Sequence, residues 1–123
     1  MTLPKRDEKR EQRITDEIVV DANGPEEQSL GWSCYLEDVM EFPFKAKCIT
    51  TKATSPVALG EIVDVVGMAG GDECEHEMHV EIMWMDRTLV VPLAQLSPID
   101  ASEKTIEAIE DWHYWVRQGY SFE

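Results

Sequence analysis

Between residues 44 and 93 the chain alternates apolar and polar residues in short segments separated by turn residues. Because side chains on a β-strand point to its two faces in turn, this period of two predicts strands with one buried face. The segments that show it are 44–51, 61–68, 78–85 and 88–93. A turn is expected at Asp86-Arg87, and Pro92 places the last strand at a sheet edge or at the end of its ladder. Four or five antiparallel strands of this length predict a small, strongly bent sheet or an SH3-like barrel.

Helical periodicity flanks this central region on both sides. The stretch from Pro25 to Met40 carries its apolar residues on one stripe, and its proline suits the first helical position. A second helix is expected from Ser102, a good N-cap, to Gln118. Residues 94–99 between the sheet and this helix predict a short 3₁₀ turn. The predicted fold class is therefore α+β, with N-terminal helices, a small antiparallel SH3-like sheet or barrel, and a C-terminal helix.

The charge of the chain is strongly negative and unevenly distributed. Eleven Lys and Arg stand against 25 Asp and Glu, a formal net charge of −14, yet residues 1–13 hold five of the basic groups. We therefore expect a basic, flexible or frayed helical arm (1–13) and a single α+β domain (14–123). An acidic body repels nucleic acid and anionic membranes and attracts cations or basic proteins. Solubility alone is the alternative explanation of the charge.

The expected compartment is the cytoplasm. No apolar run approaches the roughly 20 residues that a membrane span needs, and the first residues lack the apolar core of a signal peptide. Cys34, Cys48 and Cys74 form no CxxC pair and are expected as reduced thiols. No catalytic motif is present, so we expect no enzyme, and we expect a monomer.

The densest group of carboxylates lies between two predicted strands, in Gly70-Gly71-Asp72-Glu73-Cys74-Glu75-His76-Glu77. Alternate acids of an extended loop point to one side, where they repel each other unless a cation neutralises them. Ca²⁺ is the first candidate because it takes six to eight oxygen ligands. Glu81 continues the group along the next strand. The spaced DxDxDG pattern of an EF-hand is absent.

A second acidic group stands at the end of the helix predicted over 25–40. Its members are Glu37, Asp38 and Glu41. Acids there are unfavourable because they lie at the negative end of the helix dipole. Residues that disfavour their own local structure in this way are expected at functional sites. The alternative is that the helix ends early and these acids are simply solvated. The last helix carries a further acidic face, made of Glu107, Glu110 and Asp111.

Zinc is the alternative metal. Cys74, His76 and His79 offer a thiolate and two imidazoles within six residues, which are ligand types that zinc prefers. Cys48 or His113 could supply a fourth ligand. The competing interpretation is that Cys74 packs as a small apolar side chain and that both histidines are exposed.

Several motifs occur in an order that is typical of one family. They are Glu37-Asp38-Val39-Met40-Glu41-Phe42-Pro43-Phe44, Gly67-Met68, Asp72-Glu73-Cys74-Glu75-His76-Glu77-Met78, Val91-Pro92-Leu93 and Glu110-Asp111-Trp112-His113-Tyr114-Trp115. From about Ile14 to Trp115 the chain resembles the small acidic bacterial calcium-binding proteins first known from cyanobacteria, the CcbP type. The resemblance implies Ca²⁺ binding without an EF-hand and a role as a calcium buffer or sensor.

The same resemblance implies that the ligands come from the acidic loop and from the end of the helix before it. The candidate ligands are Glu37, Asp38, Glu41, Asp72, Glu73, Glu75, Glu77 and Glu81. The alternative function is an acidic SH3-like interaction module that docks a basic protein or mimics DNA.

Overall fold

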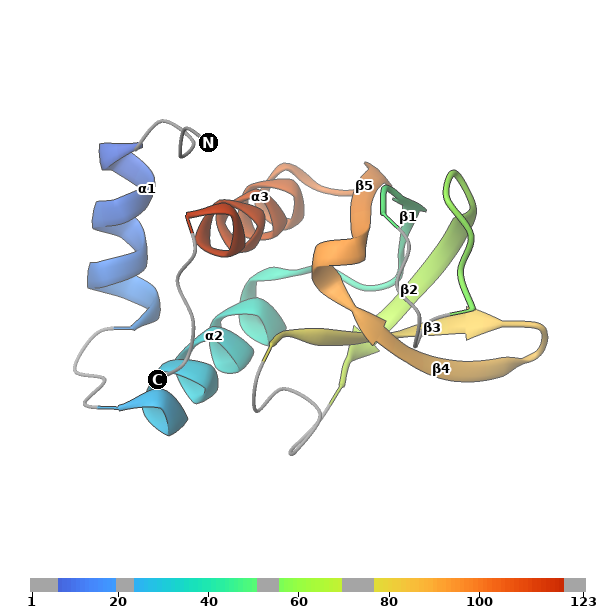
Figure 1. Cartoon of the computed structure of the whole chain (residues 1–123), viewed down its shortest axis with the longest axis horizontal. Coiled ribbons are helices and arrows are strands. Elements are labelled where there is room, and N and C mark those ends of the chain that lie inside the picture. The colour runs from blue at the N-terminus through green and yellow to red at the C-terminus, as the bar shows by residue number, and fades with distance from the viewer. Residues whose placement is uncertain (1–6, 20–23, 51–55, 70–76, 119–123) are drawn as a thin grey trace.

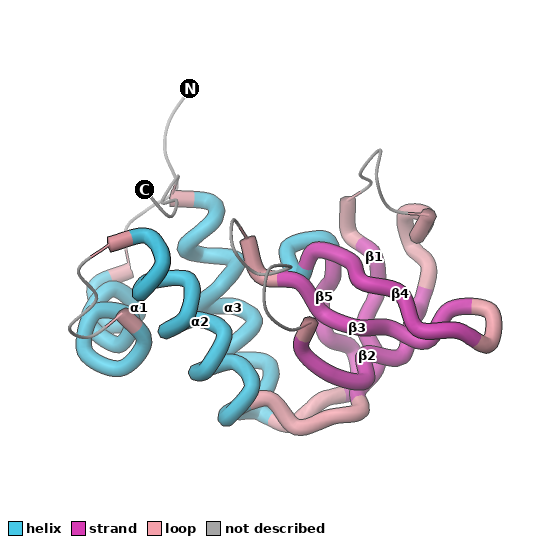
Figure 2. The backbone as a smooth tube through the Cα atoms, turned by 90° about the horizontal axis from the view of Figure 1, so that it is seen from below, coloured by secondary structure: helices cyan, strands magenta, loops and turns pink. Residues whose placement is uncertain are grey.

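The computed structural model describes residues 7–19, 24–50, 56–69 and 77–118. Its helices gather on one side of the molecule and its sheet on the other (Figure 1, Figure 2). In chain order the elements are α1 (Glu8–Arg13), the π-helical turn η1 (Ile14–Ile18), α2 (Pro25–Val39), β1 (Phe44–Cys48), β2 (Ile62–Met68), β3 (His79–Trp84), β4 (Arg87–Pro92), the 3₁₀ turn η3 (Leu93–Gln95), β5 (Leu96–Asp100) and α3 (Glu103–Arg117). This order confirms the predicted α+β class.

The five strands form one antiparallel sheet in the order β4-β3-β2-β1-β5. β4 is an edge strand and ends at Pro92, as the sequence predicted. Within the described residues β4 and β5 do not pair, so the sheet is open and a closed SH3-like barrel is not confirmed. No helix in these ranges is long and apolar enough to cross a membrane.

One predicted element was wrong. The 3₁₀ turn expected over 94–99 is confined to Leu93–Gln95, and the chain then continues as β5. Residues of β5 do not alternate cleanly between apolar and polar, so the sequence gives no strand signal there. The strand forms because it pairs with β1 in antiparallel fashion, with Leu96 opposite Cys48. The sheet therefore gains an edge strand that lies next to α3 (Figure 1).

Burial follows the predicted alternation in β1, in the first part of β2 and in the first part of β3, but not in β4. Phe44, Ala46 and Cys48 of β1 are buried, whereas the two lysines between them are exposed. β3 and β4 are joined by a two-residue hairpin turn one position earlier than predicted, at Met85 and Asp86. Both have positive φ, 47° and 67°, which matches the tight turn that suits the twist of paired strands.

Aromatic side chains join the two long helices. Trp32 of α2 is fully buried and meets the rings of Trp112 and Trp115 of α3 edge-on, at centroid distances of 5.0 and 5.5 Å. Such edge-to-face pairs add about 0.5–1.5 kcal/mol to the stabilisation from burial alone. α3 begins at the predicted cap, where the Ser102 side chain accepts a hydrogen bond from the Thr105 N–H.

The segment before α2 is anchored by η1. Ile14 and Ile18 are buried, and the Val19 N–H donates to the Ile14 carbonyl at 2.9 Å. α2 approaches this turn at Gly31, where a Cβ atom would lie 2.4 Å from the Ile18 carbonyl oxygen. Only glycine permits this approach, so Gly31 fixes how η1 sits against α2.

Candidate metal centre

Three of the predicted ligands lie where α2 ends. Glu37 and Asp38 are exposed in its last turn, and Glu41 is exposed two residues beyond it. The helix closes with a hydrogen bond from the Met40 N–H to the Leu36 carbonyl, so it reaches the predicted acids and does not end early. No hydrogen bond or ion pair engages the three carboxylates among the residues that the structure describes.

The backbone of Glu41 is held by α3. Its N–H donates to the Thr105 hydroxyl at 2.8 Å, and Thr105 is fully buried. The same hydroxyl lies 2.9 Å from that of Ser102, the cap of α3. The exit of α2 is therefore tied to the start of α3, and Glu41 projects from a fixed backbone.

Two further predicted ligands lie at β3. Glu81 is half-buried on the strand, opposite Gly67 of β2 and Val90 of β4. Its carboxylate has no ion pair among the described residues. Glu77 precedes the strand, and His79 contacts it twice, through Nδ1 to the Glu77 carbonyl at 3.0 Å and through Nε2 to its Oε1 at 3.8 Å. His79 and Glu81 both lie on the less buried face of β3, as predicted.

The other predicted ligands, Asp72, Glu73 and Glu75, lie outside the described residues. Within the described ranges no three His, Cys, Asp or Glu side chains converge on one point. The donor chemistry nevertheless fits a hard cation, because the exposed acids at the end of α2 and the half-buried Glu81 of β3 offer carboxylate oxygens that no cationic side chain of the described ranges neutralises.

The zinc alternative finds little support in the part of the chain that the structure describes. The thiol of Cys48 is buried and donates to the Thr50 carbonyl at 3.1 Å. His113 is hydrogen-bonded through Nε2 to the Leu96 carbonyl at 2.7 Å. Both proposed fourth ligands therefore have other partners. Cys74 and His76 lie outside the described residues.

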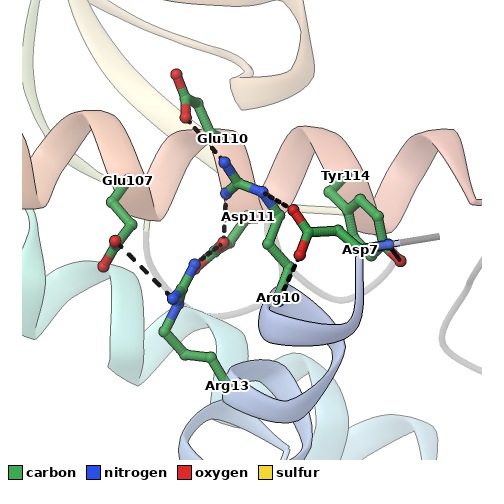
Figure 3. A network of polar contacts seen from close by, with 7 residues as sticks. All are labelled: Asp7, Arg10, Arg13, Glu107, Glu110, Asp111 and Tyr114. Carbon is green, nitrogen blue, oxygen red and sulfur yellow. Dashed lines mark hydrogen bonds and ion pairs between the residues drawn. The ribbon is translucent and has the colours of Figure 1, made fainter. Parts of the chain in front are cut away.

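The most extensive charge network lies elsewhere, between α1 and α3 (Figure 3). Asp111 is fully buried, although the sequence placed it on an exposed acidic face. Arg13 donates to its two carboxylate oxygens from Nε and Nη2 at 2.8 and 2.7 Å. Arg10 donates to it from Nη1 at 2.6 Å and to Glu110 from Nη2 at 3.0 Å. Glu110 and Asp111 of α3 are therefore neutralised by the N-terminal arginines.

The pKa values of the two arginines of this network and of Tyr35 are raised. Burial lowers the pKa of Arg10, but hydrogen bonds and attraction to Asp111 and Glu110 outweigh burial and the net shift is upward. The hydrogen bonds from Arg13 to Asp111 raise the pKa of Arg13 well above its ordinary value. Burial, and then the negative charge of Asp111, raise the pKa of Tyr35. Both arginines therefore stay charged at any physiological pH.

A cavity of about 310 Å³ lies beside this network, and its walls come from α1, α3, β5 and Ile49. It is lined by Arg10, Ile49, Ser97, Pro98, Ile106, Glu110, His113 and Arg117. Burial lowers the pKa of His113, and its hydrogen bond to Leu96 only partly opposes the shift. None of the predicted calcium ligands lines this cavity, which separates it from the candidate metal centre.

Sequence reasoning did not foresee the pairing of α1 with α3. The signals were present, because five basic groups stand within residues 1–13 and Asp111 follows Ala108 and precedes Trp115 at helical spacing. An acid on the apolar stripe of a helix needs an internal counter-ion. The division of the chain at residue 13 remains a prediction, but residues 8–13 are helical, Asp7 caps them, and this segment contacts α3.

Comparisons with known proteins point to one family. A family model described as calcium binding, Calci_bind_CcbP, matches residues 12–116. The crystal structure of Anabaena CcbP is 41% identical, with 99% of this chain and 100% of that chain covered and a TM-score of 0.88. A second solved structure, described as a calcium-binding protein in the calcium-binding form, is also 41% identical in sequence. The match covers 95% of this chain and 96% of that chain, with a TM-score of 0.84. A comparison with curated proteins gave no match.

Proposed function

Because the chain belongs to the CcbP family of calcium-binding proteins, we propose that it binds Ca²⁺ through carboxylates of two segments. The first is the end of α2, with Glu37, Asp38 and Glu41. The second is the acidic stretch that leads into β3, with Asp72, Glu73, Glu75, Glu77 and Glu81. The family match over nearly the whole chain carries this proposal.

The acids at the end of α2 suit a cation for two reasons. Their carboxylates are exposed and, among the described residues, without a counter-ion. They also stand at the negative end of the helix dipole, so an unpaired cation is attracted there by both the side chains and the backbone. The hydrogen bond from Glu41 to Thr105 supports the site, because it fixes the backbone of one donor.

We propose that the protein acts in the cytoplasm as a calcium buffer or sensor. Exposed carboxylates on short tethers form an incomplete cage, for which a dissociation constant of about 10⁻⁶ to 10⁻³ M is expected. No catalytic role is proposed. The domain that binds calcium is taken to extend over residues 14–123.

Calcium-dependent thermal unfolding of the chelator-treated protein tests the ligand assignment. A cation that binds only the folded state stabilises it by about 2.7 kcal/mol when its concentration is 100 times the dissociation constant. The double variants Asp38→Asn/Glu41→Gln and Glu75→Gln/Glu77→Gln are expected to lose most of the rise in Tm. The matched control is Asp16→Asn/Glu17→Gln, which removes the same charge from exposed acids of η1.

The control variant is expected to keep the rise in Tm shown by the unmodified protein. If the control and the two ligand variants lost the calcium-dependent rise in Tm equally, calcium binding would depend only on the net charge of the protein. No rise in Tm in the unmodified protein at millimolar Ca²⁺ would refute calcium binding itself.

A second candidate function is the docking of a basic protein on the outer face of the sheet. Ile62, Val66, Met83 and Val90 are all exposed apolar side chains of β2, β3 and β4. Asp64 lies opposite Met83, so acidic and apolar groups are mixed there. Replacing Glu75 and Glu77 by Gln should abolish calcium binding but weaken such docking only slightly, because the docking charge is spread.

A further inference from the structure

α1 is held in place by charge, without apolar burial. None of its residues is buried, whereas η1, which follows directly, buries Ile14 and Ile18. The helix is thus divided at its α-to-π junction into a charged part and an apolar anchor. The anchor is reinforced by its close approach to Gly31 of α2.

In Figure 3 the contacts of the charged part with the rest of the fold lead to one helix, α3. The Asp7 N–H donates to the Tyr114 hydroxyl at 3.0 Å, and Arg10 bridges Asp111 and Glu110. Arg13 binds Asp111 side-on and lies 3.8 Å from Glu107. Two guanidinium groups therefore pair with three carboxylates of α3, of which Asp111 is buried and the other two are exposed.

We propose that residues 7–13 form an electrostatically latched strap that opens as a unit, while η1 and the rest of the fold stay in place. Opening requires no loss of buried apolar surface from α1, because it buries none of its residues. It does break the charge-assisted hydrogen bonds of Arg10 and Arg13 to Asp111, and the loss of these bonds keeps the closed form dominant. Local opening below the free energy of global unfolding is expected of elements with few apolar contacts.

The two positions of the strap differ in surface charge. In the closed form Arg10 and Arg13 neutralise Glu107, Glu110 and Asp111. In the open form the arginines leave Asp111, which is buried in the closed form, and also Glu107 and Glu110, which are exposed in both. Opening also removes Arg10 from the wall of the cavity beside α3. The strap therefore buries Asp111 and neutralises the acidic surface of α3 around it, much as a basic partner would.

Hydrogen exchange of the full chain tests this proposal. The amides of α1, such as Glu11, which donates to the Asp7 carbonyl, report opening of the strap, and those of β3 report global unfolding. In the unmodified protein α1 is expected to exchange faster than β3. Asp111→Asn, which removes the charge under both arginines, is expected to speed α1 exchange about 10- to 100-fold, the range for losing hydrogen bonds to a charged group.

Glu103→Gln is the matched control, since it removes an exposed acid from the same helix at a position outside the network. It is expected to leave α1 exchange unchanged. Arg13→Lys serves if Asp111→Asn does not fold, because it keeps the charge but loses the side-on pair, and a smaller acceleration confined to α1 is expected. Exchange of α1 and β3 at one common rate, or equal acceleration of both in the variants, would overturn the strap.

Discussion

The guanidinium of Arg13 and the carboxylate of Asp111 are joined side-on by two hydrogen bonds, across 98 positions of sequence. The acid is fully buried, and Arg10 donates to the same carboxylate. Buried charges are tolerated only when they are paired and hydrogen-bonded. The N-terminal basic cluster is therefore part of the folded structure, at least from residue 7 onward.

Replacing Arg13 by Gln is expected to destabilise the protein by about 2–4 kcal/mol, because it leaves Asp111 buried with one arginine instead of two. Urea unfolding measures the change. Lys9→Gln is the control: Lys9 is an exposed cation of the same helix, and a change within about 0.5 kcal/mol is expected. Equal effects of the two substitutions would show that only the net charge of the arm matters.

A double-mutant cycle measures the interaction between Arg13 and Asp111 separately from the effect of losing either side chain. Asp111→Asn combined with Arg13→Gln is expected to cost less than the sum of the two single changes, because each single change strands the other partner. The coupling free energy comes from the four unfolding curves. A sum that is simply additive would contradict the side-on pairing.

Gly31→Ala is expected to destabilise the protein, although alanine is the better helix former by up to about 1 kcal/mol. The added Cβ would lie 2.4 Å from the Ile18 carbonyl oxygen, and neither backbone can yield without moving η1. Thermal unfolding tests this, with Gly67→Ala as the control. The nearest atom to a Cβ there is 3.6 Å away, an ordinary contact. A higher Tm in Gly31→Ala would contradict the close approach.

Local pattern predicted much of the fold. The alternation at Phe44, Ala46 and Cys48 gave β1, and the cap at Ser102 gave the start of α3. β5 escaped prediction because its order depends on pairing with β1, which no local pattern reports. Asp111 escaped for the same reason, since its counter-ions lie far away in sequence.

The candidate site was predicted less completely. The acids at the end of α2 stand exposed as expected, but convergence on one ion is a property of tertiary structure that charge spacing cannot supply. Glu77 and Glu81 are placed at β3, whereas Asp72, Glu73 and Glu75 lie outside the described residues. The assignment of ligands among these acids stays a prediction.

Stability is expected to fall on acidification in part because of His113. Its pKa is lowered in the folded state by burial, so the unfolded chain binds a proton more readily. The contribution is fully present above the ordinary pKa of about 6.5 and is lost as pH falls below that value toward the lowered one. Thermal unfolding of His113→Gln between pH 7 and 5 should show a shallower decline than the unmodified protein. Parallel declines would contradict this, because carboxylate titrations are common to both.

Thr105→Val is expected to destabilise the protein by about 1–2 kcal/mol, since the Glu41 N–H loses its acceptor. Because this hydrogen bond fixes the exit of α2, calcium affinity should fall as well. Thr105→Ser keeps the hydroxyl and is the control for affinity. Calorimetric titration with Ca²⁺ measures the affinity of both variants. If Thr105→Val and Thr105→Ser bound calcium equally well, the hydrogen bond to Thr105 would not position the site.

Calcium binding through the two acidic segments is tested most directly by calorimetric titration of the chelator-treated protein. CaCl₂ should give a saturable heat with a dissociation constant of about 10⁻⁶ to 10⁻³ M, and MgCl₂ a weaker response. The combined variant Asp38→Asn/Glu41→Gln/Glu75→Gln/Glu77→Gln should give no saturable heat. Unchanged calcium binding by that variant, or equal binding of Mg²⁺ and Ca²⁺ by the unmodified protein, would contradict a calcium site built from these acids.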